Sequence, residues 1–417
     1  MNKTVFPNGK KVSRNDIKTG INNNICVCGT SGTGKTRNVI IPNLLEMSGS
    51  YIVTDPKGFL YKKYAKHFKD NGYIVKNLSF VHPERSCHYN PLDFCETTQD
   101  IQTLAYSFVY SDRNVYSSKD PYWDEQALFL INSVFSYLLE AEKKGLPEES
   151  PTILNAIEYI RKAGQKSMYP RRGGLLTEGF SKQNMYIYEA LIDSYKEQYG
   201  AAFCTRQYDN VLSAPEKTYS TIITSALSKF SSVETDELAV MLEDNEVDID
   251  EIVNKKTIYF VEVSDIDNSM NLLVNVFFTQ IMSLICKYAD EKCENGRLPN
   301  DVIFIMDDFP SYKINNFDNI VNNIRSRGIS VIITVQTLKQ LDNIYDNGES
   351  IISNCDTMIF MGTNDINTAS ELSVKINAPQ NKLLNMPINT HYIIRRGGKC
   401  EFSENIESED LIAEYLG

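Results

Sequence analysis

The amino-acid sequence predicts an α/β protein whose mainly parallel sheet is interrupted in the sequence by an all-α domain. Three observations predict this fold class. A phosphate-binding pattern directly follows an apolar strand near the N-terminus, a second apolar strand far downstream ends in two aspartates, and between them helical periodicity replaces strand–helix alternation. Because alternating strands and helices are typical of parallel sheets, the purely helical stretch is expected to form a separate domain.

The first block of alternation runs from Ile25 to about Ser79. Short apolar runs rich in β-branched residues predict strands, and longer segments with a period near 3.6 residues predict helices. The expected order is the strand Ile25–Cys28, a loop and helix, the strand Tyr51–Thr54, a helix at 60–70 and the strand Tyr73–Val75. This is the βαβαβ order of a parallel sheet.

The middle of the chain shows helical periodicity and no convincing strand. Helices are expected at Ile101–Tyr110, Trp123–Glu142, Thr152–Lys162, Lys182–Tyr199 and Thr218–Phe230. Alternation then resumes with the strand Thr257–Val263, a long helix at Asn271–Glu291, and strands at Val302–Met306, Ser330–Val335, Thr357–Met361 and His391–Ile394. The predicted domains are therefore a discontinuous nucleotide-binding domain (1–96 and 252–417) and an all-α domain (97–251). Two domains also fit a chain of 417 residues, which exceeds the roughly 250–300 residues of a single core.

The phosphate-binding pattern is a complete G-x-x-x-x-G-K-[ST] loop. Its residues are Gly29, Thr30, Ser31, Gly32, Thr33, Gly34, Lys35 and Thr36. The glycines let consecutive N–H groups point at an anion, and the following helix adds the positive end of its dipole. Lys35 is expected to reach the β- and γ-phosphates of a nucleoside triphosphate, and the Thr36 hydroxyl to hold Mg²⁺. The alternative is a flexible strand-to-helix turn.

The second nucleotide signature is the apolar run Val302–Met306, which ends in Asp307 and Asp308. A continuous apolar run is typical of a parallel strand buried on both faces. Asp307 is expected to bind Mg²⁺, and Asp308 stands where many strand-type ATPases carry a catalytic glutamate. The shorter side chain of Asp308 puts the hydrolysis rate in doubt. Alternatively, the two carboxylates simply end a strand.

Composition limits the class of protein. The formal net charge of −12 argues against extensive coating of nucleic acid but allows a local basic surface. No signal peptide or transmembrane span is expected, and the nine cysteines lack metal-ligand spacing, so reduced cytosolic thiols are expected. Basic residues gather at Lys57, Lys62, Lys63, Lys66 and Lys69, and at Arg161, Lys162, Lys166, Arg171, Arg172 and Lys182. These clusters are either a DNA or partner surface or the ordinary polar faces of helices.

Several further motifs together resemble the type IV coupling proteins of bacterial conjugation and type IV secretion, the TraG-like family. They are Ile52–Gly58 (I-V-T-D-P-K-G), Tyr89–Asp93, Asp120–Asp124, Ala214–Thr218, Thr334–Thr337 with Gln340 and Leu341, and Met361–Asp365. No single motif decides the resemblance; their order and spacing do. The resemblance extends over nearly the whole chain from about residue 20.

The resemblance implies a RecA-like nucleotide-binding domain that uses ATP and Mg²⁺ and assembles as a homo-hexamer, with a monomer in solution as the alternative for the isolated chain. It implies DNA bound without sequence preference, relaxase or other secreted protein substrates, and type IV secretion channel components as partners. By position, Gln336 matches the family's γ-phosphate sensor. Arg325 matches the arginine presented to the neighbouring subunit's ATP, and Arg327 is its close rival. A structural strand-end glutamine and solvated helix-end cations are the alternatives.

The resemblance also places the protein at the cytoplasmic face of the bacterial inner membrane. Family members usually begin with transmembrane helices, whereas here about twenty polar residues precede the first expected strand. Either an anchor is missing from this sequence, or the chain is a soluble cytoplasmic form that reaches the membrane through a partner.

Three functions remain open at this stage. The first is an ATP-driven motor that feeds relaxase–DNA or effector substrates to a secretion channel. The second is a nucleotide-binding receptor or scaffold with weak hydrolysis, which the short Asp308 side chain favours. The third is a chromosome-segregation or packaging translocase, which the large helical insertion disfavours.

Overall fold

The computed structural model describes residues 2–110, 121–146, 150–170, 182–264, 266–267 and 269–416. The chain folds into two compact units. The first comprises Met1–Arg85, Asp248–Asn268 and Ile281–Gly417, and the second comprises Ser86–Val247 and Ser269–Gln280.

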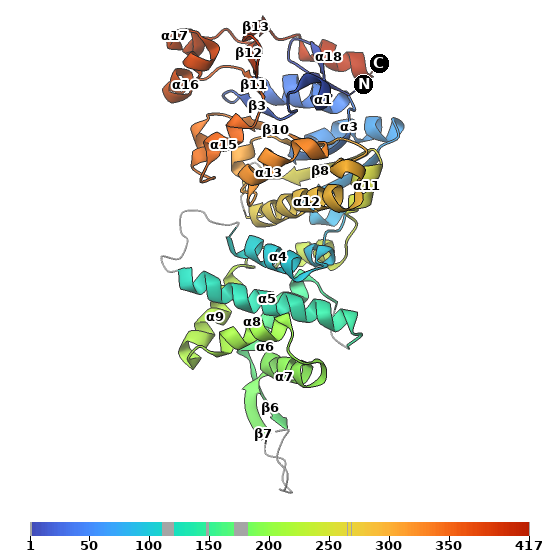
Figure 1. Cartoon of the computed structure of the whole chain (residues 1–417), viewed down its shortest axis with the longest axis vertical. Helices are drawn as coiled ribbons and strands as arrows, with labels where there is room; N and C mark the ends of the chain where they lie inside the picture. Colours follow the sequence, from blue (N-terminus) through green and yellow to red (C-terminus); the bar gives the residue numbers. More distant parts are fainter. Residues whose placement is uncertain are drawn as a thin grey trace. The chain divides into compact units, whose positions relative to one another are not determined.

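The first unit is built on a nine-stranded sheet (Figure 1). In spatial order its strands are β13 (Glu401–Glu404), β12 (Thr390–Arg395), β11 (Thr357–Phe360), β3 (Ile25–Cys28), β10 (Ile329–Val335), β9 (Val302–Met306), β4 (Ser50–Pro56), β8 (Thr257–Val263) and β5 (Ile74–Ser79). β12 pairs antiparallel with both of its neighbours, β11 and β13, at one edge, and the other pairings are parallel. The predicted α/β class with a mainly parallel sheet is confirmed.

The central strands are apolar because the sheet is covered on both faces. Every residue of β3, β9, β10 and β11 is buried. Register places Val27 of β3 beside Thr334 of β10 on one side and Ile359 of β11 on the other. The continuous apolar runs thus predict these strands well.

Helices and short helical turns complete the first unit. They are α1 (Asp16–Thr19), a π-helical turn (Thr36–Ile40), α2 (Ile41–Leu45), α3 (Phe59–Asp70), α11 (Ile249–Asn254), α13 (Phe317–Asn323), α14 (Lys339–Asp342), α15 (Gly348–Ser353), α16 (Ile366–Ile376), α17 (Gln380–Leu384), α18 (Ser408–Leu416) and 3₁₀ turns at Pro83–Arg85, Glu294–Gly296, Phe309–Ser311 and Arg325–Arg327. Leu44 of α2, Phe68 of α3 and Ile412 of α18 share one buried apolar cluster with Ile303 and Val53 of the sheet. These three helices therefore cover one face of the sheet.

The long helix α12 (Asn271–Lys292) contributes to both units, since the second unit ends at Gln280 and the first resumes at Ile281. Within the described residues it is the one helix long and apolar enough to cross a membrane, with a mean hydropathy of 1.5. However, 67% of its apolar window is buried inside the protein, as expected of a core helix.

The sequence predicts no strand in the N-terminal segment, but the structure shows two. The segment forms a hairpin of β1 (Lys3–Val5) and β2 (Lys11–Ser13), which pair antiparallel. Phe6 at the turn is buried in the apolar cluster of the first unit. Burial of this ring fixes the hairpin against the sheet domain.

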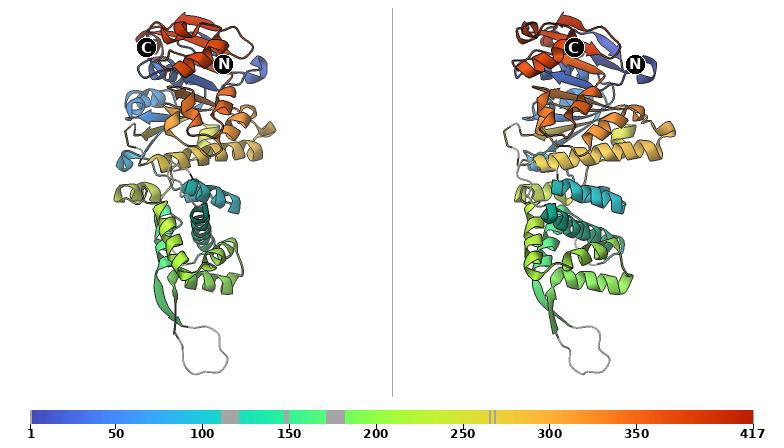
Figure 2. Two further views of the ribbon diagram at one scale, coloured as in Figure 1. Left: turned by 90° about the vertical axis from the view of Figure 1, so that its left-hand side faces the viewer. Right: turned by 60° about the vertical axis from the view of Figure 1, so that its left-hand side comes forward.

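The second unit is mainly helical. Its elements are a 3₁₀ turn (Pro91–Phe94), α4 (Thr98–Tyr110), α5 (Pro121–Lys143), α6 (Ile153–Gly164), β6 (Lys166–Pro170), β7 (Lys182–Tyr186), α7 (Ile187–Tyr199), α8 (Phe203–Leu212), α9 (Glu216–Ser228) and α10 (Asp236–Glu243). The expectation that residues 97–243 contain no strand is wrong, because β6 and β7 form an antiparallel hairpin. This hairpin extends from the helices of its unit in Figures 1 and 2.

The expected helix Lys182–Tyr199 begins at Ile187 for a physical reason. The Glu189 carboxylate accepts a hydrogen bond of 3.2 Å from the Tyr186 backbone N–H, which caps the helix at that point. The residues before Tyr186 remain extended and pair with β6.

The junction between the units precedes the expected boundary at residue 96, and Tyr89 explains why. Its hydroxyl donates to the Gln280 side chain at 2.7 Å, its N–H donates to the Met241 carbonyl at 2.8 Å, and its ring packs edge-on against Phe277. Residues 86–96 therefore fold with the second unit.

Candidate functional site

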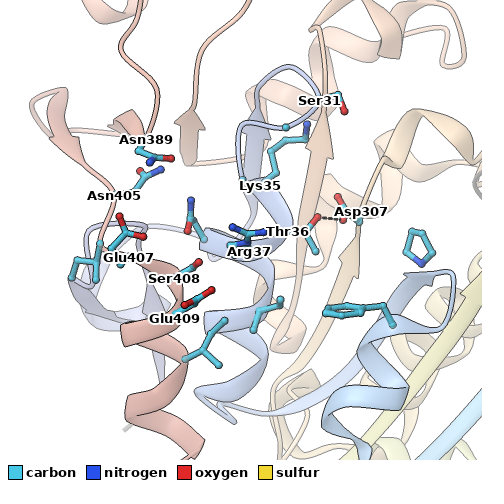
Figure 3. A pocket seen from close by; sticks show the side chains of 18 of the residues that line it. Ser31, Lys35, Thr36, Arg37, Asp307, Asn389, Asn405, Glu407, Ser408 and Glu409 are labelled. Atoms are coloured by element: carbon cyan, nitrogen blue, oxygen red, sulfur yellow. Dashed lines mark hydrogen bonds between the residues drawn. The ribbon is translucent and has the colours of Figure 1, made fainter.

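The candidate site lies at the carboxyl ends of three adjacent strands, β3, β10 and β9. The phosphate-binding loop follows β3, Gln336 follows β10, and Asp307 with Asp308 follows β9. Ligands of open parallel sheets bind at this edge. A pocket of about 690 Å³ opens there (Figure 3). Its lining includes Ser31, Gly32, Gly34, Lys35, Thr36, Arg37, Phe59, Lys63, Asp307, Asp308, Gln336, Asn389, Asn405, Ile406, Glu407, Ser408 and Glu409.

The loop adopts its shape through glycine. Gly32 and Gly34 have φ angles of +81° and +87°, which residues with a Cβ rarely adopt. A Cβ on Gly34 would also lie 2.6 Å from the Asn38 amide nitrogen. The loop is tied to the sheet because the Gly29 N–H donates to the Val335 carbonyl at 3.1 Å and the Thr30 N–H donates to the Gly362 carbonyl at 3.2 Å.

Lys35 lies inside the curve of this loop. Its ammonium donates to the carbonyls of Gly29 at 2.6 Å and Thr30 at 3.1 Å. Desolvation lowers the pKa of Lys35, and the nearby charges of Asp307 and Asp308 oppose that shift. A partly desolvated cation at the end of a Gly-rich loop is suited to an anionic ligand.

Thr36 and Asp307 meet across the strand ends. The Thr36 hydroxyl donates to one carboxylate oxygen of Asp307, as the dashed line in Figure 3 marks, and the Thr334 hydroxyl donates to the other at 2.7 Å. The Asp307 N–H donates to the Thr54 hydroxyl at 2.8 Å. The sequence alone assigns no role to Thr54 or Thr334, although both lie within the motifs Ile52–Gly58 and Thr334–Thr337.

Asp308 has a left-handed backbone, with φ of +52°. This conformation costs a non-glycine residue roughly 1 kcal/mol, and aspartate tolerates it better than most. Its N–H donates to the Thr334 hydroxyl at 2.8 Å, and its carboxylate accepts from the Ser311 hydroxyl at 3.1 Å. The amide nitrogen of Gln336 lies 3.5 Å from the same carboxylate. The two residues therefore face one another over the pocket.

Gln340, whose function was not predicted, orders the turn after β10. Its side-chain oxygen accepts from the backbone N–H groups of Gln336 at 3.1 Å and Thr337 at 3.2 Å. This arrangement fixes the backbone from which the Gln336 side chain projects.

The donor set fits a triphosphate with Mg²⁺. Among the residues that the structure describes, no group of three or more His, Cys, Asp or Glu side chains could hold a metal by itself. Mg²⁺ needs no such cluster, because it usually takes one or two protein oxygens together with phosphate and water. The hydroxyl of Thr36 and the carboxylate of Asp307 are oxygen ligands of this type.

Arg325 and Arg327 lie away from this pocket, before β10 rather than after it. Since β10 spans seven residues, its two ends are about 20 Å apart. The Arg325 guanidinium donates to the Asp16 carbonyl at 3.1 Å and lies 3.6 Å from its carboxylate. Arg327 pairs with both carboxylate oxygens of Asp290, at 2.8 and 2.7 Å. Neither arginine contributes to the pocket of its own chain.

The C-terminal part of the pocket was not predicted. Asn389 precedes β12, and residues 405–409 lead from β13 into α18. These segments are polar and lack a recognisable motif, so only the fold brings them to the loop.

A family model described as "Type IV secretory system Conjugative DNA transfer" matches residues 3–377. Protein VirD4 of Agrobacterium fabrum (strain C58 / ATCC 33970) is 23% identical over 359 residues, which cover 82% of this chain and 48% of VirD4. Conjugal transfer protein TraG of Escherichia coli is 23% identical over 364 residues, which cover 82% of this chain and 53% of TraG. The chain spans about half the length of these curated relatives.

Solved structures also share the fold. The plasmid coupling protein TrwB, in complex with a non-hydrolysable ATP analogue and in complex with ADP and Mg²⁺, matches with a TM-score of 0.68 at 14% identity. The match covers 97% of this chain and 89% of the TrwB chain.

Proposed function

Because the chain belongs to the type IV secretory system conjugative DNA transfer family, we propose that it is an ATP-driven coupling protein. It recruits relaxase–DNA complexes or effector proteins and feeds them to a type IV secretion channel. The observation that carries the proposal is the convergence of Lys35, Thr36 and Asp307 at the carboxyl ends of β3 and β9.

Each residue of the pocket has a role that follows from the chemistry of its side chain. Lys35 contacts the β- and γ-phosphates, while Thr36 and Asp307 hold Mg²⁺. Asp308 and Gln336 face one another at the γ-phosphate end, where they orient the attacking water. ATP would supply the phosphoryl group, and Mg²⁺ would neutralise the negative charge that develops on that group during transfer. The TrwB complexes with ADP and Mg²⁺ and with the ATP analogue support this choice of cofactor.

Binding of DNA is proposed to be electrostatic and independent of sequence. The protein carries a net charge of −12, so the DNA surface must be local. Lys62, Lys66 and Lys69 are exposed on one stripe of α3, as a phosphate-contacting surface requires. Of the second predicted basic cluster, Arg171 and Arg172 lie outside the described residues, and Arg161 and Lys166 pair with glutamates. The α3 stripe is therefore the better candidate.

The proposed assembly is a homo-hexamer at the cytoplasmic face of the bacterial cell membrane. The chain is monomeric in dilute solution and forms the ring on DNA. Under this proposal Arg325 acts on the nucleotide of a neighbouring subunit.

Steady-state ATP turnover, measured with and without duplex DNA, tests the function. We expect DNA to raise turnover, and DNA affinity to fall with rising salt at a log–log slope of about −0.9 per neutralised phosphate. Lys35→Ala protein is the control for contaminating ATPases. Slow turnover that DNA does not change, with no DNA binding at low salt, would instead support a nucleotide-binding receptor, the candidate that the short Asp308 side chain favours.

A further inference from the structure

The nucleotide pocket has two ends, and the sheet order distinguishes them. β10 and β9, which are followed by Gln336 and Asp307, lie on one side of β3, whereas β11, β12 and β13 lie on the other. A triphosphate whose γ end lies near Asp307 therefore directs the rest of the nucleotide toward the C-terminal strands. In Figure 3, Asn389 and Asn405 lie on the opposite side of the loop from Asp307. Ile41, Ile406 and Ile412 add apolar lining to the pocket, which suits a flat base.

A chain of hydrogen bonds fixes the orientation of the Asn405 side chain. It begins at the N-terminal hairpin, where the Lys10 N–H donates to Asn8 Oδ1 at 3.2 Å. The Asn8 amide group therefore faces Ser403 as a donor, and donates to its hydroxyl at 3.1 Å. The Ser403 hydroxyl still has its own proton to donate, and it lies 3.1 Å from His391 Nε2.

His391 links Ser403 to Asn405, which lines the pocket. It is fully buried, and burial lowers its pKa, so the ring is neutral near pH 7. Its Nδ1 lies 2.7 Å from Asn405 Oδ1, and because an amide oxygen can only accept, the proton of the neutral ring is on Nδ1 and Nε2 accepts from Ser403. The oxygen of Asn405 is thus occupied, and its NH₂ group is directed away from His391.

The Asn405 NH₂ group is a buried donor without a partner among the described residues. Buried polar groups normally have one, so this orphaned donor calls for an explanation. The Asn405 backbone N–H donates to the Asn389 carbonyl at 2.7 Å, which holds the segment against the start of β12. The donor is therefore held in place by its surroundings.

We propose that the Asn405 NH₂ group donates a hydrogen bond to an acceptor on the nucleoside of the bound nucleotide, with His391 and Ser403 as positioning residues. This inference rests on the proposed binding of ATP at Lys35 and Thr36. The acceptor is either a ring nitrogen or carbonyl of the base or a ribose oxygen. The N-terminal hairpin and the C-terminal strands thus form the nucleoside end of the site together.

Calorimetric titration of the full chain with ATP and with inorganic tripolyphosphate, both with Mg²⁺, tests the proposal. Asn405→Asp keeps the oxygen that His391 needs but replaces the donor with an acceptor. We expect it to weaken ATP binding about tenfold or more and to leave tripolyphosphate binding unchanged. Asn343→Asp, at an exposed asparagine outside the pocket, is the matched control for the added charge.

Titration with GTP and 2′-deoxy-ATP identifies the acceptor. A loss in Asn405→Asp that disappears with 2′-deoxy-ATP assigns the 2′-hydroxyl, and a loss that differs between ATP and GTP assigns the base. Unchanged ATP affinity in Asn405→Asp, or an equal loss for tripolyphosphate, would overturn the inference alone. If the unaltered chain bound neither ATP nor tripolyphosphate, the proposed function would fall as well.

The positioning residues have a spectroscopic test. With four histidines in the chain, the ¹⁵N signals of the His391 ring can be assigned by substitution. We expect the Nδ1–H tautomer in the unaltered protein, and a shift toward the Nε2–H tautomer with weaker ATP binding in Ser403→Ala. An Nε2–H tautomer in the unaltered protein would contradict the proposed orientation of Asn405.

Discussion

The Thr36 hydroxyl donates a hydrogen bond to the Asp307 carboxylate, although 271 positions separate the two residues in the sequence. The contact arises because β3 and β9 are both parallel neighbours of β10, so that their carboxyl ends lie at one edge of the sheet. Under the proposed function, the Thr36 hydroxyl and the Asp307 carboxylate would both hold Mg²⁺, which would replace this hydrogen bond.

Removal of the Thr36 hydroxyl is therefore expected to affect mainly the Mg²⁺-dependent part of nucleotide binding. Thr36→Val keeps the volume and β-branching of threonine but removes the oxygen. We expect affinity for a non-hydrolysable ATP analogue to fall about tenfold or more with Mg²⁺ and to change little in EDTA, as measured by calorimetry. Thr36→Ser, which keeps the hydroxyl, is the control. An equal loss with and without Mg²⁺ would contradict the assignment.

Lys35→Ala is expected to weaken binding of the same analogue by about 10- to 100-fold or more, because hydrogen bonds from a charged donor contribute about 1.5–3 kcal/mol each. No other cation lies within the loop. Lys66→Ala, on exposed α3 and outside the pocket lining, provides the comparison. Unchanged affinity in Lys35→Ala would exclude the proposed phosphate site.

Asp308 is expected to govern turnover rather than binding. Asp308→Asn keeps a residue type that tolerates the left-handed backbone, so the fold should be retained. We predict unchanged affinity for the ATP analogue and a loss of turnover of about 10²–10⁴-fold, the usual contribution of a general base. Steady-state hydrolysis measures this. Faster turnover in Asp308→Glu would show that side-chain reach limits the reaction, while normal turnover in Asp308→Asn would refute the role.

The nucleotide loop and the central strands could be predicted because their signals are local. The bounds of β9 agree with the apolar run Val302–Met306. Five of the eight predicted loop residues line the pocket, namely Ser31, Gly32, Gly34, Lys35 and Thr36. Their proposed roles in binding and catalysis still await the experiments above. By contrast, β13 is a polar, mostly exposed edge strand, and its apolar pattern is too weak to predict it.

Contacts between distant segments explain the rest of what the sequence did not predict. Asn8 contacts Ser403 across 395 positions, so neither residue signals a site by itself. The hydroxyls of Thr54 and Thr334 could be assigned to the site only from the structure, because the parallel register brings both to Asp307. The positions of Arg325 and Gln336, at opposite ends of β10, likewise follow from strand direction rather than from a motif.

The lowered pKa of His391 predicts that the stability of the protein depends on pH. Burial lowers the pKa of this ring below the ordinary value of 6.5, and the hydrogen bond with Asn405 partly offsets this. The unfolded chain therefore binds the proton more readily, so this contribution to the free energy of unfolding decreases as pH falls below about 6.5. We expect His391→Gln to show a smaller loss of stability between pH 7.5 and pH 5.5 in urea denaturation. Identical pH dependence in both proteins would argue against a buried neutral ring.

The last prediction is that hydrolysis is completed between subunits, with Arg325 reaching the γ-phosphate held by the neighbour's Lys35 and Thr36. In its own chain Arg325 lies beyond the far end of β10 from the pocket, so under this prediction it would act on the nucleotide of another subunit. Its side chain is 39% exposed and held by Asp16, whereas that of Arg327 is 23% exposed and paired with both oxygens of Asp290. Arg325 is therefore the more exposed of the two arginines and the first candidate for the role in trans, and Arg327 is the second.

An arginine supplied in trans typically contributes about 10³–10⁵ in rate, so the monomer should be almost inert and specific activity should rise with protein concentration or with DNA. Arg325→Ala and Lys35→Ala proteins should each be inactive, yet a mixture should recover activity, because one interface in the mixed ring has both an intact arginine and an intact loop. Arg327→Ala mixed with Lys35→Ala is the matched comparison. Recovery only in that second mixture would transfer the role to Arg327. Activity that is independent of concentration, with no recovery in either mixture, would rule out a shared site.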